Sequence, residues 1–345
     1  MTTLLLGTPD AVVRMQIDGD AGRPDGLLEV PGVTSLAVDP HNGELAYAAT
    51  NGNGLHRTTD CGRTWSRGGE GIDRPIQSCV AVSRSHRNGD TGAVFVGTEM
   101  AALYRSEDGG ATFTELSALQ DVPSKPTWSF PPKPNTNHIV SLDTDPEDPE
   151  RVYVGVELGG IIRTEDGGET FLDATAIQDL DPHQIRTHPK APGRVYEGGG
   201  SSYCESRDHG SSWTRDIEAM PDEIRYFFTL ALDPGDPETM VISSARDPFT
   251  GHKAVPGAVA WSTVYRRTAD RDWHELTSAN GLPQQEETLM AILDTDERTP
   301  GEFWYATDPA VVYRSSNSGE SWEQIRLEWP DGVEEKITCM AISAV

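Results

Sequence analysis

The chain has 345 residues, of which 36% are hydrophobic, and its 28 Lys and Arg residues against 55 Asp and Glu residues give a formal net charge of −27. This apolar content is sufficient for a folded core, and no run of about eighteen apolar residues is present that could cross a membrane. Because binding to phosphate groups requires a basic surface, the charge excludes nucleic acid as a partner and disfavours anionic membranes.

The charged and sulfur-containing residues also bear on the cellular setting. Only five of the basic residues are Lys, and an acidic, Lys-poor surface is typical of proteins from salt-adapted cytoplasms, where counter-ions screen self-repulsion. The codon usage of a GC-rich genome is the alternative explanation. The N-terminal segment lacks the basic region of a signal peptide, so we expect a cytoplasmic protein. The four Cys residues form no CxxC pair, so we expect free thiols.

Short strands are predicted along the whole chain. Apolar runs with a period of two, bounded by Gly, Asp and Pro, indicate antiparallel strands. No long segment has the 3.6-residue apolar period of a helix, so we expect little helix. In chain order the predicted strands are residues 3–8, 11–15, 27–30, 34–40, 44–50, 54–57, 78–84, 93–98, 102–105, 139–146, 151–156, 160–163, 184–189, 194–199, 202–205, 228–234, 239–245, 264–267, 290–296, 302–307, 311–314 and 336–343.

A short motif recurs after every third strand. Its core is Ser/Thr-x-Asp-x-Gly-x-Thr/Ser followed by Trp or Phe, and the copy around Asp270 is shortened by two residues. An Asp oxygen accepts backbone N–H bonds in a tight turn, Gly supplies a positive φ, and the aromatic ring buries a large face between neighbouring sheets. Because a catalytic acid is needed only once, six copies indicate a structural turn. The third positions are Asp60, Asp108, Asp166, Asp208, Asp270 and Asn317.

These motifs resemble the Asp-box, or bacterial neuraminidase, repeat, which is found in sialidases, sortilin-type receptors, xyloglucan hydrolases and photosystem assembly factors. The resemblance covers nearly the whole chain and implies a β-propeller. It does not imply one activity, because unrelated activities share the repeat.

The repeats predict a single all-β domain over residues 1–345, a seven-bladed β-propeller of four-stranded antiparallel blades. The copies lie 42 to 62 residues apart, which is the length of one blade, and they account for six blades. Residues 336–345 have the pattern of an innermost strand, so we expect them to join residues 1–30 in a closing blade that leaves no free edge. A six-bladed ring is the alternative.

The loops divide between two faces of such a ring. The box turns lie on one face, here called the bottom, and propeller ligands usually bind at the opposite top face near the central channel, which is an inference by analogy. Two long insertions, residues 122–138 and 246–261, are predicted on the top face. Further candidate ligand-binding residues lie in loops or strand entries of that face: Asn51, Trp128, Arg225, Tyr226, Arg246 and Asp308.

Four residues are the catalytic candidates of the top face: Glu99, Glu157, His138 and His183. Two carboxylates can divide acid and base roles in glycoside hydrolysis. His138 and His183 with Glu157 are also a candidate divalent metal site of Zn, Mn or Fe. The plain alternative is that the glutamates are solvated and the histidines only hydrogen-bonded.

Two functions therefore stay open. The first is a pocket for a small polar or sugar-like ligand, in a hydrolase or lyase with or without a metal. The second is a non-catalytic propeller that binds a protein partner. Sialidase chemistry is not expected, because sialidases use three arginines and an Arg-Ile-Pro motif, whereas Arg14 is followed by Met and the top face offers only Arg225 and Arg246. The xyloglucan hydrolases use a cleft between two propellers, and this chain has the length of one.

Overall fold

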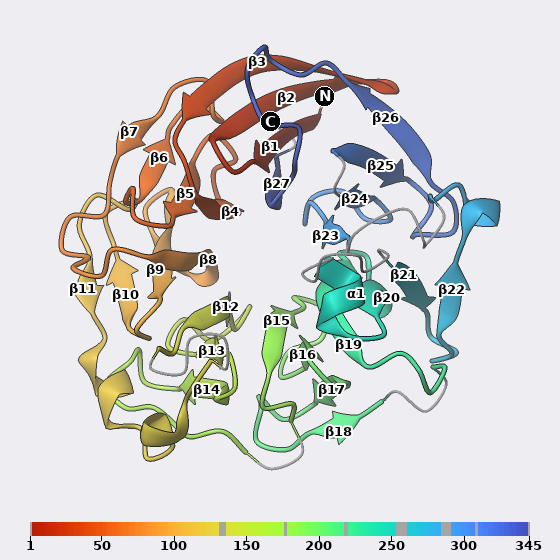
Figure 1. Cartoon of the computed structure of the whole chain (residues 1–345). Helices are drawn as coiled ribbons and strands as arrows, with labels where there is room; N and C mark the ends of the chain where they lie inside the picture. Colours follow the sequence, from red (N-terminus) through yellow and green to blue (C-terminus); the bar gives the residue numbers. More distant parts are fainter. Residues whose placement is uncertain are drawn as a thin grey trace.

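The computed structural model describes residues 2–130, 136–175, 178–216, 220–252, 261–283, 291–307 and 310–343. The strands form sheets that follow one another around a ring, with both termini in the same sheet (Figure 1). Helix is confined, in these ranges, to one five-residue α-helix and three 3-10 turns, as the sequence predicts. None of the described helices is long and apolar enough to cross a membrane.

Six sheets make up the described part of the fold, with strand orders β4-β5-β6-β7, β8-β9-β10-β11, β12-β13-β14, β15-β16-β17-β18, β19-β20-β21-β22 and β23-β24-β25-β26-β3-β2-β1-β27. The strand bounds are β1 Thr2–Gly7, β2 Ala11–Asp18, β3 Ala21–Glu29, β4 Val33–Val38, β5 Ala46–Thr50, β6 His56–Thr58, β7 Ser66–Arg67, β8 Gln77–Asn88, β9 Thr91–Thr98, β10 Leu103–Ser106, β11 Thr114–Glu115, β12 Ile139–Thr144, β13 Val152–Val156, β14 Gly160–Thr164, β15 Pro182–Thr187, β16 Val195–Gly199, β17 Tyr203–Ser206, β18 Thr214–Arg215, β19 Tyr226–Asp233, β20 Asp236–Ala245, β21 Ser262–Arg267, β22 His274–Leu276, β23 Ile292–Asp294, β24 Phe303–Thr307, β25 Val311–Ser315, β26 Glu323–Leu327 and β27 Cys339–Ser343. The helical turns are η1 Ser117–Asp121, η2 Lys125–Thr127, α1 Pro248–His252 and η3 Ser278–Asn280.

The two ends of the chain pair with each other. β27 runs antiparallel to β1, with Thr3 opposite Ser343 and Gly7 opposite Cys339, as the pattern of the C-terminal residues predicts. The β27-β1-β2-β3 half of this sheet meets the β23–β26 half through a short parallel pairing, in which Arg326 lies opposite Ala21. The pairing of β27 with β1 covers the free edge that β1 would otherwise present.

The recurring motif forms the turn that the sequence predicts. In the copy at Asp108, its carboxylate accepts the Ser106 hydroxyl at 2.8 Å and the backbone N–H and hydroxyl of Thr112 at 2.9 and 2.7 Å. The N–H of Gly110 donates to the Ser106 oxygen, and Gly110 has a φ of 76°. Burial raises the pKa of Asp108, but the hydrogen bonds from Thr112, Ser106 and Ala111 together outweigh it and lower the pKa to about 2. The carboxylate is therefore held by its own turn, which is a structural role.

Arginines connect five of the six turns to the preceding sheet. A guanidinium on the third strand of one sheet donates to a backbone carbonyl in the turn of the next sheet, so the bonds run around the bottom face. The pairs are Arg14 to Cys61 at 2.7 Å, Arg57 to Gly109 at 2.9 Å, Arg105 to Gly167 at 3.2 Å, Arg163 to Gly210 at 3.1 Å and Arg266 to Ser318 at 2.6 Å.

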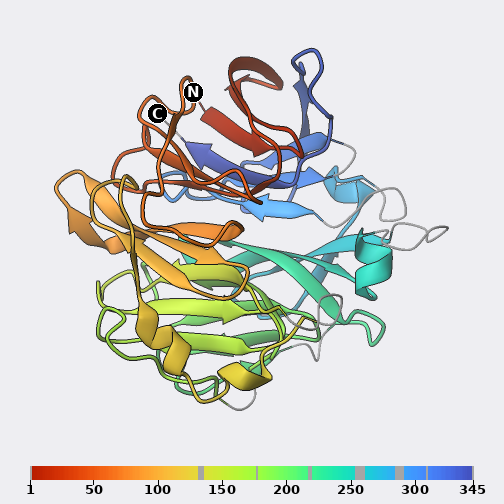
Figure 2. The same cartoon turned by 60° about the vertical axis from the view of Figure 1, so that its left-hand side comes forward.

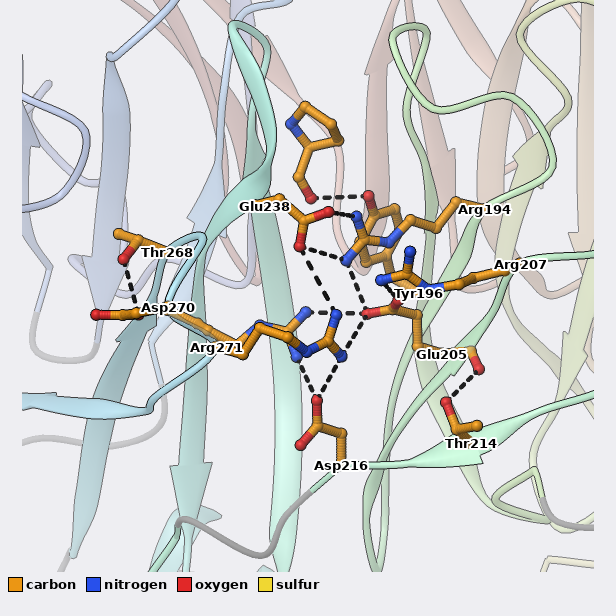
Figure 3. Close-up of polar contacts among 12 residues, drawn as sticks. Arg194, Tyr196, Glu205, Arg207, Thr214, Asp216, Glu238, Thr268, Asp270 and Arg271 are labelled. Carbon is orange, nitrogen blue, oxygen red and sulfur yellow. Dashed lines mark hydrogen bonds and ion pairs between the residues drawn. The ribbon is translucent and has the colours of Figure 1, made fainter.

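The β15–β18 sheet has Glu205 where the other copies have Arg, and the next sheet supplies the missing cations. Figure 3 shows Glu205 and Asp216 facing arginines from both sheets. The Glu205 carboxylate, 1% exposed, contacts Arg194 at 2.9 Å and the fully buried Arg267 at 3.0 Å. Arg271 lies in the shortened turn at a φ of 67° and contacts Asp216 at 2.8 Å. The shortened motif and the Glu for Arg exchange are thus two halves of one charge-reversed contact.

A second set of bonds joins the innermost strands, β4, β8, β12, β15, β19, β23 and β27, which surround the centre of the ring in Figure 1. Hydroxyl and amide side chains of one strand bond to the backbone of the next, which occupies these polar groups and positions the strand entries of the top face. The pairs are Thr34 with Gln77, Ser35 with Val80, Ser78 with Ile139, Ser141 with Ile185, Gln184 with Leu230, Thr229 with Ala291 and Leu293, and Thr338 with Val33.

Candidate functional site

Side chains from three neighbouring sheets meet where the innermost strands begin. His138 directly precedes β12, His183 is the second residue of β15, and Tyr226 opens β19. Glu157 follows β13, and His252 ends α1, which lies beyond the strand ends on one face of the ring (Figure 2). Innermost strands begin, and second strands end, on the face opposite the box turns, so all five residues belong to the predicted top face.

His138 and Glu157 form one pair. Their Nε2 and Oε2 atoms are 2.6 Å apart, and the side chains are 17% and 18% exposed. The backbone joins them too, since the N–H of Glu157 donates to the carbonyl of His138 at 3.2 Å. The ring of Phe130 packs edge-on against the imidazole, with centroids 5.0 Å apart. The imidazole therefore holds the Glu157 carboxylate at a fixed place beside an aromatic ring.

His183 and Asp181 form the second pair. The Nδ1 atom of His183 lies 2.5 Å from the carbonyl oxygen of Phe227, and because a carbonyl only accepts, Nδ1 carries the hydrogen. Nε2, which is an acceptor when the ring is neutral, lies 3.7 Å from Oδ2 of Asp181. Burial raises the pKa of Asp181; the nearby His183 opposes this shift, and the charge of Glu157 adds to it. Asp181 thus keeps its proton to higher pH than an ordinary Asp and faces a group able to exchange it.

An aromatic wall closes one side of this pair. The rings of His183 and Tyr226 lie 4.7 Å apart, and the Tyr226 hydroxyl contacts Nε2 of His252 at 3.2 Å. His252 also packs against Phe228 at 4.9 Å. Burial lowers the pKa of His252, and His183 lowers it further when that ring is protonated, so the His252 imidazole is neutral at neutral pH. The wall is apolar with two polar tips, a combination typical of small-molecule sites.

Two buried carboxyl groups stand behind Asp181. Asp179 accepts the N–H of Asp181 at 3.1 Å, and the side chains of Ser201 and Ser202 at 2.9 and 3.0 Å. Glu197 has no exposed surface, and its Oε2 accepts the N–H of Asp179 at 3.1 Å. Burial, with the neighbouring Asp179 charge, raises the pKa of Glu197 well above its ordinary value. This second tier fixes the segment that carries Asp181.

Glu197→Gln should change how stability depends on pH. A buried acid with a raised pKa keeps its proton in the folded state while the unfolded chain releases it, so stability falls as pH rises from the ordinary Glu pKa toward the folded one. Gln resembles the protonated form and removes this penalty. Thermal melts should give similar midpoints for the two proteins at about pH 4 and a higher midpoint for the variant at about pH 8.

A matched control is Glu169→Gln, the same chemical change on an exposed turn. It should leave the pH profile of the melting temperature unchanged. A lower melting temperature for Glu197→Gln than for the natural protein at about pH 8 would show that Glu197 is ionised in the folded state.

The remaining predicted residues lie apart from this cluster or contribute differently. The backbone of Glu99 forms an isolated bridge with His138, which places it at the edge of the site. Asn51 forms a similar bridge with Ile76 in an exposed loop. Asp308 lies outside the described residues. Of the catalytic candidates, His138, His183 and Glu157 therefore meet in one cluster, together with the ligand candidate Tyr226.

Three ligand candidates are engaged elsewhere. Trp128 is 5% exposed, packs in the core and donates to the Ser124 hydroxyl at 2.9 Å, so the start of the first insertion belongs to the outer rim, where Figure 1 shows η1 and η2 in yellow. Arg225 pairs with Asp222 at 3.2 Å. The Arg246 guanidinium stacks on Trp261 at 4.6 Å.

The predicted metal ligands are split between the two pairs, with Glu157 on His138 and His183 on Asp181. Across residues 2–343, apart from the six undescribed gaps, no group of three or more His, Cys, Asp and Glu side chains is placed to hold a metal ion.

Sequence reasoning missed Asp181, Phe228 and His252. Asp181 could have been found, because Asp181-Pro182-His183 opens the same innermost strand whose His183 was singled out. His252 follows the fifth sheet's second strand in an insertion, and no local pattern shows that a short helix turns it back over Tyr226.

Comparison with known proteins shows related folds at low identity, and no family model matches the chain. An oligoxyloglucan-reducing end-specific xyloglucanase of Emericella nidulans is 22% identical over 87% of this chain and 41% of its own length. An ancestral GH74 enzyme superposes over 99% of this chain and 40% of its own, with a TM-score of 0.63 and 17% identity. A YCF48 structure with a bound D1 peptide covers 85% of this chain and 80% of its own, with a TM-score of 0.56 and 15% identity. The chain spans less than half the length of the xyloglucanase that it matches.

Proposed function

We propose that the top-face cluster binds a carbohydrate and carries the two carboxyl groups of a glycoside hydrolase. The proposal rests on the different environments of the Asp181 and Glu157 carboxyl groups. Asp181 is half-buried and its pKa is raised by burial, whereas Glu157 is held by the imidazole of His138. Two carboxyl groups with environments that differ in this way divide acid and base roles, as glycoside hydrolysis requires.

Each residue then has a role. Asp181 keeps its proton and gives it to the leaving oxygen as the general acid. Glu157, fixed by His138, acts at the opposite side of the sugar as base or nucleophile. Tyr226 and Phe228 supply the apolar wall against which a sugar ring packs. The similarity to xyloglucanases supports a β-glucan as the substrate class.

The architecture is part of the proposal. The eight-stranded sheet divides into two four-stranded halves, and with the five other sheets this gives seven blades of the Asp-box type. The hydrogen bonds of the box turns and their repetition support this count. The six-bladed alternative would require the β27-β1-β2-β3 set to belong to its neighbour, although only two residue pairs join β3 to β26.

A non-catalytic binding propeller is the second candidate. One observation favours it: the YCF48 structure is matched over most of its own length, and that protein holds a peptide. Under this alternative the same cluster binds a peptide segment, and Asp181 and Glu157 recognise its polar groups without breaking a bond.

The test is hydrolysis and binding with xyloglucan. We expect release of reducing sugar by the natural protein, and a fall in rate of about a hundredfold or more for Asp181→Asn and Glu157→Gln, since general acid–base groups contribute on this order. Asp222→Asn, which changes a fully exposed carboxylate near the site, is the control and should be silent. Binding without hydrolysis by the natural protein would overturn the catalytic part of the proposal, and a lack of both would overturn all of it and leave the second candidate.

A further inference from the structure

The candidate site lies at the mouth of a central cavity. The seven innermost strands enclose a volume of about 340 Å³, and His183 and Phe228 of the candidate site line its upper end. This volume is at the lower end of the range of small-molecule sites, about 300–1,000 Å³. A ligand bound at the site can therefore extend into the cavity inside the ring.

An ion bridge crosses the other end of this cavity. Arg84 on β8 donates to the Asp143 carboxylate on β12 at 2.6 Å, and the same guanidinium pairs with Glu297, which follows β23 on the far side of the ring. Thr187 on β15 accepts a further bond from Arg84 at 3.3 Å. The bridge crosses the path that a polymer would take through the ring, so a chain that enters from the candidate site cannot pass through to the bottom face.

Two charged groups inside the cavity retain capacity for a ligand. Most hydroxyl and amide groups of the wall are used in the bonds between innermost strands, whereas Arg186 has one described hydrogen bond, to the carbonyl of Ile185 at 3.1 Å, and no described ion pair. The carboxylate of Asp294 receives the backbone N–H of Thr295, and Arg186 is the cation that acts on it. Arg186 lies three residues beyond His183, or about 10 Å along the strand.

We propose that this bridged cavity is a subsite for the terminal unit of a carbohydrate chain, with Arg186 donating to its hydroxyl oxygens and Asp294 accepting from its hydroxyl groups. The inference rests on the proposed function and adds that the protein engages chain ends, not chain interiors. A neutral, hydroxyl-rich group suits the pair, since a guanidinium only donates and a carboxylate only accepts.

Binding to an oligosaccharide and to a polymer distinguishes recognition of chain ends from recognition of chain interiors. Isothermal titration with a xyloglucan oligosaccharide and with polymeric xyloglucan, using Asp181→Asn to prevent cleavage, should give at most two protein copies per polymer chain and a similar dissociation constant per chain end. Arg186→Met and Asp294→Asn should each weaken binding about tenfold, and Arg67→Met, which changes an exposed Arg on β7, should not. Melting temperatures taken alongside verify that the variants are folded.

The outcomes test this inference separately from the proposed glycoside hydrolase function on which it rests. End recognition would be overturned if many protein copies bound each polymer chain and if Arg186→Met and Asp294→Asn bound xyloglucan as tightly as the protein without them. The glycoside hydrolase proposal would still stand. A failure of every glucan to bind would overturn both.

Discussion

A chain that lacks residues 336–345 should lose its cooperative fold. β27 contributes the buried Met340 and Ile342 to the cluster around Leu4 and Leu6, and it supplies the hydrogen-bond partner of β1. Its removal exposes an apolar core face and an unpaired strand edge together. We expect a thermal transition that is broad and at least ten degrees lower, or absent, measured by far-ultraviolet circular dichroism and calorimetry.

Adding the missing segment back as a peptide tests whether the loss of the β27–β1 pairing, and not the shorter chain as such, destabilises the protein. A synthetic peptide with the sequence 336–345, added in excess to the truncated protein, should restore the transition, because pairing with β1 needs no covalent link. If the truncated protein melts like the full chain, the pairing of the termini does not stabilise the ring.

Arg267→Met should be among the most destabilising single substitutions. The guanidinium is fully buried, contacts Glu205 and Asp216 at 3.0 and 2.8 Å, and stacks on Tyr203 and Trp273 at 4.9 Å. Met keeps the length of the side chain and removes the charge, so Glu205 stays buried with part of its compensation missing. Breaking a buried pair in this way costs about 3–5 kcal/mol, which chemical denaturation would measure.

Two further variants make this prediction specific. Arg326→Met removes an exposed ion pair with Asp20 at 2.7 Å and should cost about 1 kcal/mol or less. The double variant Arg267→Met with Glu205→Met removes both members of this pair, leaves Arg194 paired with Glu238, and should be more stable than Arg267→Met alone. A cost for Arg267→Met no greater than that of Arg326→Met would contradict the account of the charge-reversed contact.

Much of the fold follows from the sequence because its signals are local and repeated. The apolar runs 44–50 and 151–156 predict strands that the structure has as β5 and β13, and the Asp-x-Gly spacing predicts the turns. The contacts between sheets do not follow in this way. That Arg57 reaches Gly109, or that Glu205 takes the place of an Arg because Arg267 and Arg271 face it, depends on which turn lies opposite, and no single repeat encodes that.

The site is less predictable for the same reason. His138, His183 and Glu157 could be chosen because they occupy strand entries and loop positions that a propeller brings to one face. Their partners from other strands could not. Asp181 lies only two positions before His183 in the sequence, whereas it is Phe227, on the next strand, that fixes the tautomer of His183. Trp128 was a ligand-binding candidate because it is an aromatic residue in a long insertion. It is buried because Leu119 and Val122 fold back onto the same core.

Histidine resonances test most directly whether ligand binding occurs at the top-face cluster. The chain has nine His residues, and they lie in different parts of the ring. When a xyloglucan oligosaccharide is titrated into ¹⁵N-labelled protein, the imidazole signals of His138, His183 and His252 should shift together, while those of His209 in a box turn and His274 on β22 stay in place. Shifts confined to His209 and His274, with the three top-face signals unchanged under saturating ligand, would contradict the account.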